Sequence, residues 1–280
     1  MLFKRNLLNL KIGKGKIKKV ENLNRIIQYL LYLIRSIHLH GIHSPFVFQI
    51  HQDLIKESIP FYIFDEIESV RAKLLLSDKA IKVRDLGASG KGDVLIEKKI
   101  KKIAKTSLKS PRDAQLLFRL VYQFKPSTIL ELGTSMGITT SYLAKANPKA
   151  KIISIEGSNS ISKIAALNQS KLNIENIKLI VGDFKDHLPN AIQELKKLDF
   201  VFFDGNHQKE ATLNYFEHCL TAAHEESIFV FDDIYWSKEM QEAWSAIKAN
   251  PKVSISLDLY NMGIVFFKSN QAKEHFTIYH

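Results

Sequence analysis

The sequence has almost no cysteine and no long apolar run. Its single cysteine, Cys219, excludes an internal disulfide and fits a reducing compartment. No apolar run approaches the roughly 18–20 residues that cross a bilayer. The longest early run, residues 29–34, lies between Arg25 and Arg35 and lacks a small-residue cleavage site, which argues against a signal peptide. We therefore expect a cytoplasmic protein, with peripheral association to a membrane as an alternative.

Glycine-rich phosphate cradles are also missing. Residues 81–92 (IKVRDLGASGKG) hold three glycines but lack the Gly-Lys-Ser/Thr ending and a preceding buried strand, so we interpret them as a turn. In ELGTSMG, residues 131–137, Ser135 stands where the dinucleotide fingerprint requires glycine. A loop of this bulk favours a ligand without phosphates at that position.

Acidic residues are scarce in the first part of the chain. Residues 1–110 carry 22 Lys and Arg against 10 Asp and Glu, whereas residues 111–280 carry 18 against 19. The excess of positive charge therefore lies in the amino-terminal part. It indicates an anionic partner, either a membrane surface or RNA, or else a solvated lysine-rich composition with no partner.

The amino-terminal part divides into a basic flexible tail, residues 1–20, and a mostly helical extension, residues 21–107. Residues 21–38 show a wide apolar face, which we expect to pack on the core, with a membrane-surface helix as the alternative. Further helices are expected at 60–76 and 93–105. Residues 40–48 (HGIHSPFVF) are expected to cap the mouth of a site. The nearby His38, His40 and His43 more often pack or face solvent than bind a metal.

From Thr128 onward, apolar runs alternate with helical patterns. We expect strands at 128–132, 151–155, 177–181, 199–203 and 228–232, and helices at 138–146, 160–172, 186–196, 208–223 and 238–249. Ser110-Pro111 marks the start of the helix before the first strand. Near the end, VSISLDLY and IVFFK flank Asn261-Met262-Gly263, which predicts an antiparallel hairpin. The pattern predicts an α/β, doubly wound, mostly parallel sheet over residues 108–280.

Each of these strands ends in an acid. The acids are Glu131, Glu156, Asp183, Asp204 and the pair Asp232 and Asp233, at steps of 25, 27, 21 and 28 residues. The carboxyl ends of parallel strands meet at one edge of a sheet, where open α/β sheets bind ligands. The acids are therefore expected to gather around one crevice.

The residue types suggest roles within that crevice. Glu156 can accept hydrogen bonds from both hydroxyls of a ribose, while Asp183 can bind an exocyclic amine as Phe184 packs on a purine. Asp204, Asp232 and Asp233 would repel one another unless protonated or neutralised, and a hard divalent cation is the simplest neutraliser. His207 is either a general base or a cap of the next helix.

These motifs resemble the class I S-adenosylmethionine (SAM)-dependent methyltransferases. ELGTSMG, the strand-end Glu156, GDF, LDFVFFDGNH and IFVFDD carry the resemblance, which covers about residues 108–268. It implies a Rossmann-like, seven-stranded sheet with an antiparallel last strand. It also implies SAM as the cofactor. The cofactor contacts that it implies are Glu131, Gly133, Thr134, Ser135, Gly137, Glu156, Gly157, Asp183, Phe184 and Asp204.

Within that class, DGNH followed by FDDIYW resembles the O-methyltransferases that use a divalent metal. This implies a hydroxyl of a small molecule as the acceptor, Asp204 and His207 as catalytic residues, and Mg²⁺ on Asp204, Asp232 and Asp233. Two other functions stay open: an RNA methyltransferase that uses the basic arm, and a non-catalytic cofactor-binding protein anchored by residues 1–38. The sequence specifies neither the acceptor nor the oligomeric state.

Overall fold

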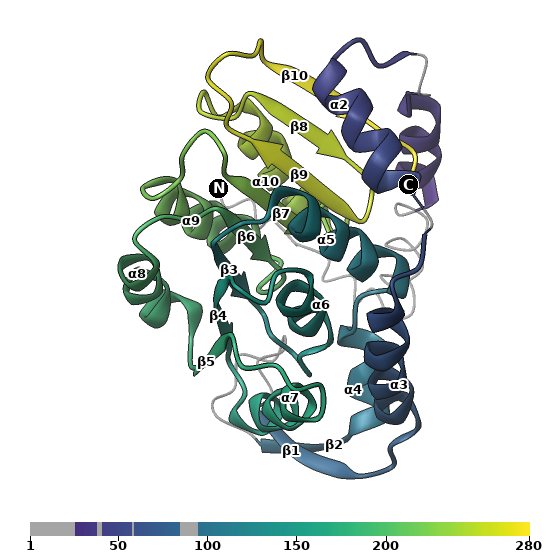
Figure 1. The fold of residues 1–280 in the computed structure, drawn as a ribbon, viewed down its shortest axis with the longest axis vertical. Helices are drawn as coiled ribbons and strands as arrows, with labels where there is room; N and C mark the ends of the chain where they lie inside the picture. The colour runs from purple at the N-terminus through teal and green to yellow at the C-terminus, as the bar shows by residue number, and fades with distance from the viewer. Residues whose placement is uncertain (1–25, 38–40, 58, 85–94) are drawn as a thin grey trace, which may run out of the picture.

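The computed structural model describes residues 26–37, 41–57, 59–84 and 95–280. Its centre is an eight-stranded sheet with the strand order β10-β8-β9-β7-β6-β3-β4-β5 (Figure 1). The expected basic tail, residues 1–20, and residues 85–92 of the expected turn at 81–92 lie outside the described residues, whereas residues 81–84 belong to a strand and not to a turn.

Five parallel strands form the middle and one edge of the sheet. They are β3 (Thr128–Leu132), β4 (Lys151–Glu156), β5 (Ile177–Val181), β6 (Phe200–Phe203) and β7 (Ile228–Asp232). Their bounds differ from the expected ones by at most one residue. β3 lies between β4 and β6, so the chain order reverses there, as in other doubly wound sheets. The predicted fold class is confirmed.

The far edge of the sheet contains the predicted hairpin and one additional strand. β8 (Ile255–Asp258) and β9 (Met262–Phe266) are antiparallel, and β9 is also antiparallel to β7. β10 (Glu274–Thr277) then pairs with β8 in parallel. The described sheet therefore has eight strands, where the sequence predicted seven.

Helices cover both faces of the sheet. One face carries α5 (Pro111–Phe124), α6 (Ile138–Ala146) and α7 (Asn159–Lys171), and the other carries α8 (Phe184–Leu195), α9 (Lys209–Leu220) and α10 (Lys238–Ala249) (Figure 1). Alternate residues of each strand supply the two cores. In β6, Phe200 and Phe202 join the first core, and Val201 and Phe203 join the second. Strands buried on both faces lack polar alternation, which explains why their apolar runs are continuous.

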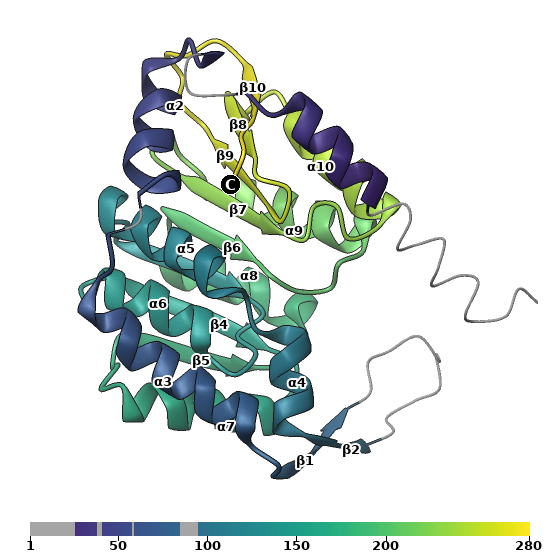
Figure 2. The same cartoon turned by 90° about the vertical axis from the view of Figure 1, so that its right-hand side faces the viewer.

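The amino-terminal part packs against the first face. It contains α2 (Pro45–Ile50), a π-helical turn at His51–Ile55, α3 (Tyr62–Leu76) and α4 (Ile100–Ser107). The helix that the sequence predicted at 93–105 is only partly correct. Residues Leu95–Lys99 form β2, which pairs in antiparallel fashion with β1 (Ala80–Arg84) at the end of the molecule near α4 (Figure 2). Strand pairing here overrides the helix propensity of LIEKK.

Residues 26–35 form a helix at the surface, beside the carboxy-terminal strand. Tyr32 anchors it, because its hydroxyl donates to the carbonyl of Ile278 at 2.5 Å. The expectation that its wide apolar face packs on the core is wrong for the helix at 26–35. Ile26, Ile27, Leu30, Leu33 and Ile34 are exposed, with Ile34 at 80%, whereas Ile37, just after the helix, packs partly buried against the core.

The segment that was expected to cap the mouth of the site does not line the pocket described below. In the segment 40–48, Phe46 packs edge-on against Phe266 with ring centroids 5.1 Å apart, and Val47 is fully buried. These residues are therefore part of the hydrophobic core beside β9. His38 and His40 lie outside the described residues, and His43 is exposed.

Candidate active site

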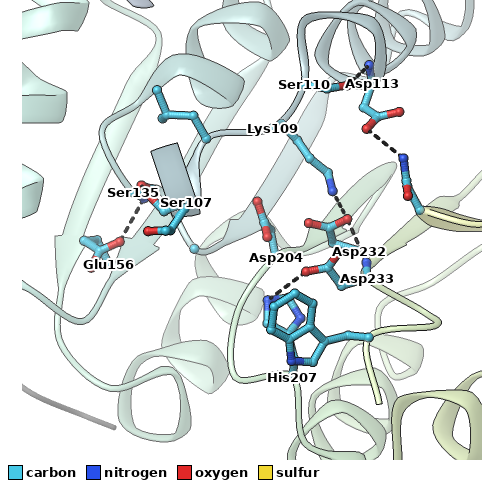
Figure 3. A pocket seen from close by; sticks show the side chains of 15 residues that line it. Ser107, Lys109, Ser110, Asp113, Ser135, Glu156, Asp204, His207, Asp232 and Asp233 are labelled. Atoms are coloured by element: carbon cyan, nitrogen blue, oxygen red, sulfur yellow. Dashed lines mark hydrogen bonds and ion pairs between the residues drawn. The ribbon is translucent and has the colours of Figure 1, made fainter. Parts of the chain in front are cut away.

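A pocket of about 400 Å³ lies at the carboxyl ends of β3, β4, β6 and β7 (Figure 3). One wall comes from these strand ends and the other from the connection between α4 and α5. It is lined by Thr106, Ser107, Leu108, Lys109, Ser110, Asp113, Gly133, Ser135, Glu156, Asp204, His207, Asp232, Asp233, Trp236 and Asn261. Its size is in the usual range for a small-ligand site.

The structure brings together seven of the residues that the sequence singled out. Gly133, Ser135, Glu156, Asp204, His207, Asp232 and Asp233 all line this pocket. Six others do not line it: Glu131, Thr134, Gly137, Gly157, Asp183 and Phe184. The convergence of strand-end acids is therefore a property of the fold, while the role of each residue stays a prediction.

Glu156 holds the loop after β3 in place. Its Oε2 accepts a hydrogen bond from the backbone N–H of Ser135 at 2.8 Å, and its Oε1 accepts one from the N–H of Ser158 at 2.9 Å. Burial raises the pKa of this carboxyl, and the two backbone donors oppose that rise. The Ser107 and Ser135 hydroxyls lie 2.9 Å apart and join the loop to the end of α4. A ligand in the pocket therefore meets a fixed carboxylate.

Glu131 supports this loop from beneath the pocket. Its side chain is fully buried, and its Oε2 accepts hydrogen bonds from Thr140 and Ser154, each at 2.5 Å. Burial raises its pKa to about 7. Thr134 also bonds to the Ser154 hydroxyl. Glu131 and Thr134 thus belong to one buried polar network under the loop.

The remaining expected cofactor residues lie at neighbouring strand ends. Asp183 caps α8 by accepting from the backbone N–H of Lys185 at 2.9 Å. The Phe184 ring packs against Gly205, where an added Cβ would approach it to 2.5 Å. Gly137 begins α6 in the left-handed region, with φ +78°. The adenine contact of Asp183 and Phe184 stays a prediction.

Three carboxylates gather at the ends of β6 and β7. The pKa of Asp204 lies well above its ordinary value, because burial disfavours its charged form and the Asp232 carboxylate repels it. Asp232 is only 4% exposed, and its Oδ1 accepts from the N–H of Asp233 at 2.7 Å. His207 Nε2 lies 3.8 Å from Asp233 Oδ2. The His207 imidazole and the Asp233 carboxylate therefore lie on the same side of the pocket (Figure 3).

Lys109 is the most prominent residue that the sequence reasoning missed. Its side chain extends toward Asp232 (Figure 3), and its ammonium forms a buried ion pair and hydrogen bond with Asp232 Oδ1. Burial lowers the pKa of Lys109, but Asp232, Asp204 and Asp233 raise it by more, so its pKa lies above the ordinary value. Among many lysines in residues 1–110, only tertiary contacts distinguish this one.

The arrangement does not fit the expected magnesium site. Within the part of the chain that the structure describes, no three His, Cys, Asp or Glu side chains are placed so that they could hold a metal ion. Lys109 is paired with Asp232, one of the expected ligands, and a divalent ion there would lie beside an ammonium. Metal coordination by Asp204, Asp232 and Asp233 therefore has no support from the geometry.

Comparison with known proteins agrees with the fold and places a methyltransferase domain in the middle of the chain. Residues 130–234 match the model of a methyltransferase-domain family. Over 128 residues the chain is 27% identical to a catechol O-methyltransferase of Niastella koreensis, covering 45% of this chain and 57% of that protein. Over 81 residues it is 33% identical to a tRNA (guanine-N(7)-)-methyltransferase of Mycoplasma mobile, covering 29% and 40%. The chain thus spans about half the length of these curated relatives.

Solved structures with the same fold cover more of the chain. A methyltransferase of Podospora anserina bound to S-adenosylhomocysteine (SAH), PaMTH1, aligns with a TM-score of 0.56 at 17% identity, covering 84% of this chain and 99% of that one. At this identity the likeness establishes the class I methyltransferase fold.

Proposed function

We propose that this chain, which carries a methyltransferase domain of the class I fold, transfers a methyl group from SAM to a hydroxyl of a small molecule. The observation that carries the proposal is the single pocket with two unlike halves (Figure 3). Gly133, Ser135 and Glu156 form one half, suited to an adenosyl ligand. His207 with Asp233 forms the other, suited to an acceptor. The name of the Niastella koreensis relative supports an O-methyl product.

For methyl transfer, the protein must activate the acceptor hydroxyl as a nucleophile and align its oxygen with the methyl group of SAM. His207 takes the proton of the acceptor hydroxyl, and the oxygen lone pair attacks the methyl carbon of the sulfonium. The carbon–sulfur bond breaks, its electron pair stays on sulfur, and the products are the methyl ether, SAH and a protonated imidazole. Asp233 stabilises that imidazolium across 3.8 Å. No step requires a metal at the carboxylates.

Binding of SAH tests the cofactor half. Isothermal titration of the full chain with SAH is expected to give one site with a dissociation constant in the micromolar range. Fixed donors and acceptors such as Glu156 need little reorganisation on binding. Absence of binding at concentrations well above micromolar would overturn the proposed function.

The basic arm and the exposed helix suggest a partner of the chain. Residues 1–25 contain eight Lys and Arg and one acid. They directly precede the helix at 26–35, in which residues 26–34 carry no charge and large apolar side chains are exposed. Cations beside an exposed apolar helix match an anionic lipid surface, which attracts both. No helix among the described residues is long and apolar enough to span a membrane. We propose that the chain docks peripherally on such a surface.

Vesicle co-sedimentation tests this partner. The full chain is expected to pellet with phosphatidylglycerol-containing vesicles and much less with pure phosphatidylcholine. Leu30→Glu together with Ile34→Glu is expected to reduce pelleting about tenfold, because two charges replace apolar contacts with the bilayer. Leu167→Glu, which changes a 62% exposed leucine on α7, is the matched control and is expected to pellet normally. Equal behaviour of both variants contradicts the docking. Salt-sensitive tRNA binding without vesicle binding would instead favour the RNA methyltransferase.

A further inference from the structure

Lys109 is a buried cation in the half of the pocket that contains His207 and Asp233. Its side chain is 8% exposed and that of its partner Asp232 is 4% exposed. The two residues come from separate parts of the fold, the α4–α5 connection and the end of β7. The backbone near Lys109 is fixed on both sides, because Arg71 donates to its carbonyl and Ser110 caps α5 by accepting from the N–H of Asp113. The ammonium is therefore held in place.

The carboxylates of the site need a positive charge nearby. Asp204, Asp232 and Asp233 line the same pocket, with Asp232 buried and the other two partly buried, so solvent screens their negative charges only in part. From the sequence alone, a divalent cation was expected to supply that charge. The structure instead places an ammonium in the cluster, and Asp232 Oδ1 already accepts from both Lys109 and the N–H of Asp233.

We propose, on the basis of the proposed function, that Lys109 is the permanent cation of this site and takes the place of a divalent metal. It neutralises the carboxylates at the ends of β6 and β7. An ammonium has three N–H donors, and Asp232 accepts one, which leaves donors for an acceptor oxygen in the same pocket. Lys109 then holds that oxygen while His207 removes its proton.

Titration with Mn²⁺, followed by electron paramagnetic resonance, tests the placement of this charge without any acceptor. The unmodified chain is expected to bind Mn²⁺ no more tightly than the millimolar range. Lys109→Met keeps the length of the side chain and removes its charge, so three carboxylates lose their counter-ion. We expect this variant to bind one Mn²⁺ at least about tenfold more tightly and to gain thermal stability when Mn²⁺ is added.

Two further variants control the experiment. Lys105→Met, at an exposed position of α4, is expected to behave like the unmodified chain. Lys109→Arg keeps the positive charge and is also expected to gain no Mn²⁺ site. Micromolar Mn²⁺ binding by the unmodified chain overturns the proposal, and it does so even if Lys109→Met fails to fold. A folded Lys109→Met chain without tighter Mn²⁺ binding overturns it equally.

SAH titration of the same samples separates this inference from the proposed function. If the unmodified chain does not bind SAH, the proposed methyltransferase activity is contradicted. The Mn²⁺ result, in contrast, reports only on the charge at Lys109. When an acceptor is identified, turnover in the presence of EDTA is expected to equal turnover without it. A loss of turnover in EDTA that Mg²⁺ restores would overturn the assignment of Lys109.

Discussion

Replacement of Glu156 by alanine is expected to weaken SAH binding by about a hundredfold or more. Two hydrogen bonds from ribose hydroxyls to a carboxylate contribute about 1.5–3 kcal/mol each. The same change frees the backbone N–H groups of Ser135 and Ser158, so the loop after β3 loses its fixed position in the pocket. Isothermal titration with SAH measures the effect, and circular dichroism confirms that the variant folds.

Two variants sharpen this test. Glu156→Gln keeps the shape but replaces one acceptor oxygen by a donor, so an intermediate loss of about tenfold or more is expected. Glu175→Ala removes an exposed glutamate just before β5 and is expected to bind SAH normally. If Glu156→Ala bound SAH as tightly as the unmodified chain, the ribose contact would be wrong and another residue would have to fill the role.

The second large effect is expected at Gly133, at the turn between β3 and the loop that leads to α6. Its φ is +108°, and a Cβ added there would lie 1.9 Å from the backbone oxygen of Asp204. Gly133→Ala must therefore separate the ends of β3 and β6, where the acids converge. We expect a loss of about 3 kcal/mol or more in the free energy of unfolding and a fall of about 5 °C or more in the melting temperature. Thermal unfolding measures it, and SAH binding should be lost in parallel.

Gly157 provides the matched control at the end of the neighbouring strand. It follows Glu156 at the end of β4, and its φ is not among the positive values of the described glycines. Gly157→Ala is expected to change the free energy of unfolding by no more than about 1 kcal/mol. Equal melting temperatures for Gly133→Ala and the unmodified chain would show that the two strand ends can separate at little cost.

The central strands could be predicted closely because their signal is local. β3 and β7 are buried on every residue, so each reads as a short apolar run bounded by a glycine or an acid. The helices between them follow from apolar periodicity and, for α5, from the Ser110 cap and Pro111. Both signals act over a few residues, and burial on two faces leaves few alternatives.

The edges of the molecule could not be predicted in the same way. β2 is mostly exposed and rich in lysine, so nothing in its pattern distinguishes it from a helix until β1 pairs with it. β10 has four residues and exists because β8 offers an unpaired edge. The helix at 26–35 has an apolar face whose environment the sequence does not specify. Partners distant in sequence decide all three.

The amino-acid sequence by itself determined the doubly wound sheet and the meeting of Glu156, Asp204, Asp232 and Asp233 at one edge, because apolar periodicity and strand direction are encoded locally. Only the tertiary structure decided what balances those acids. Lys109 precedes Asp232 by more than a hundred residues and becomes its partner because α4 and α5 pack over the strand ends. Electrostatic interactions depend on distance in space, which sequence spacing does not give.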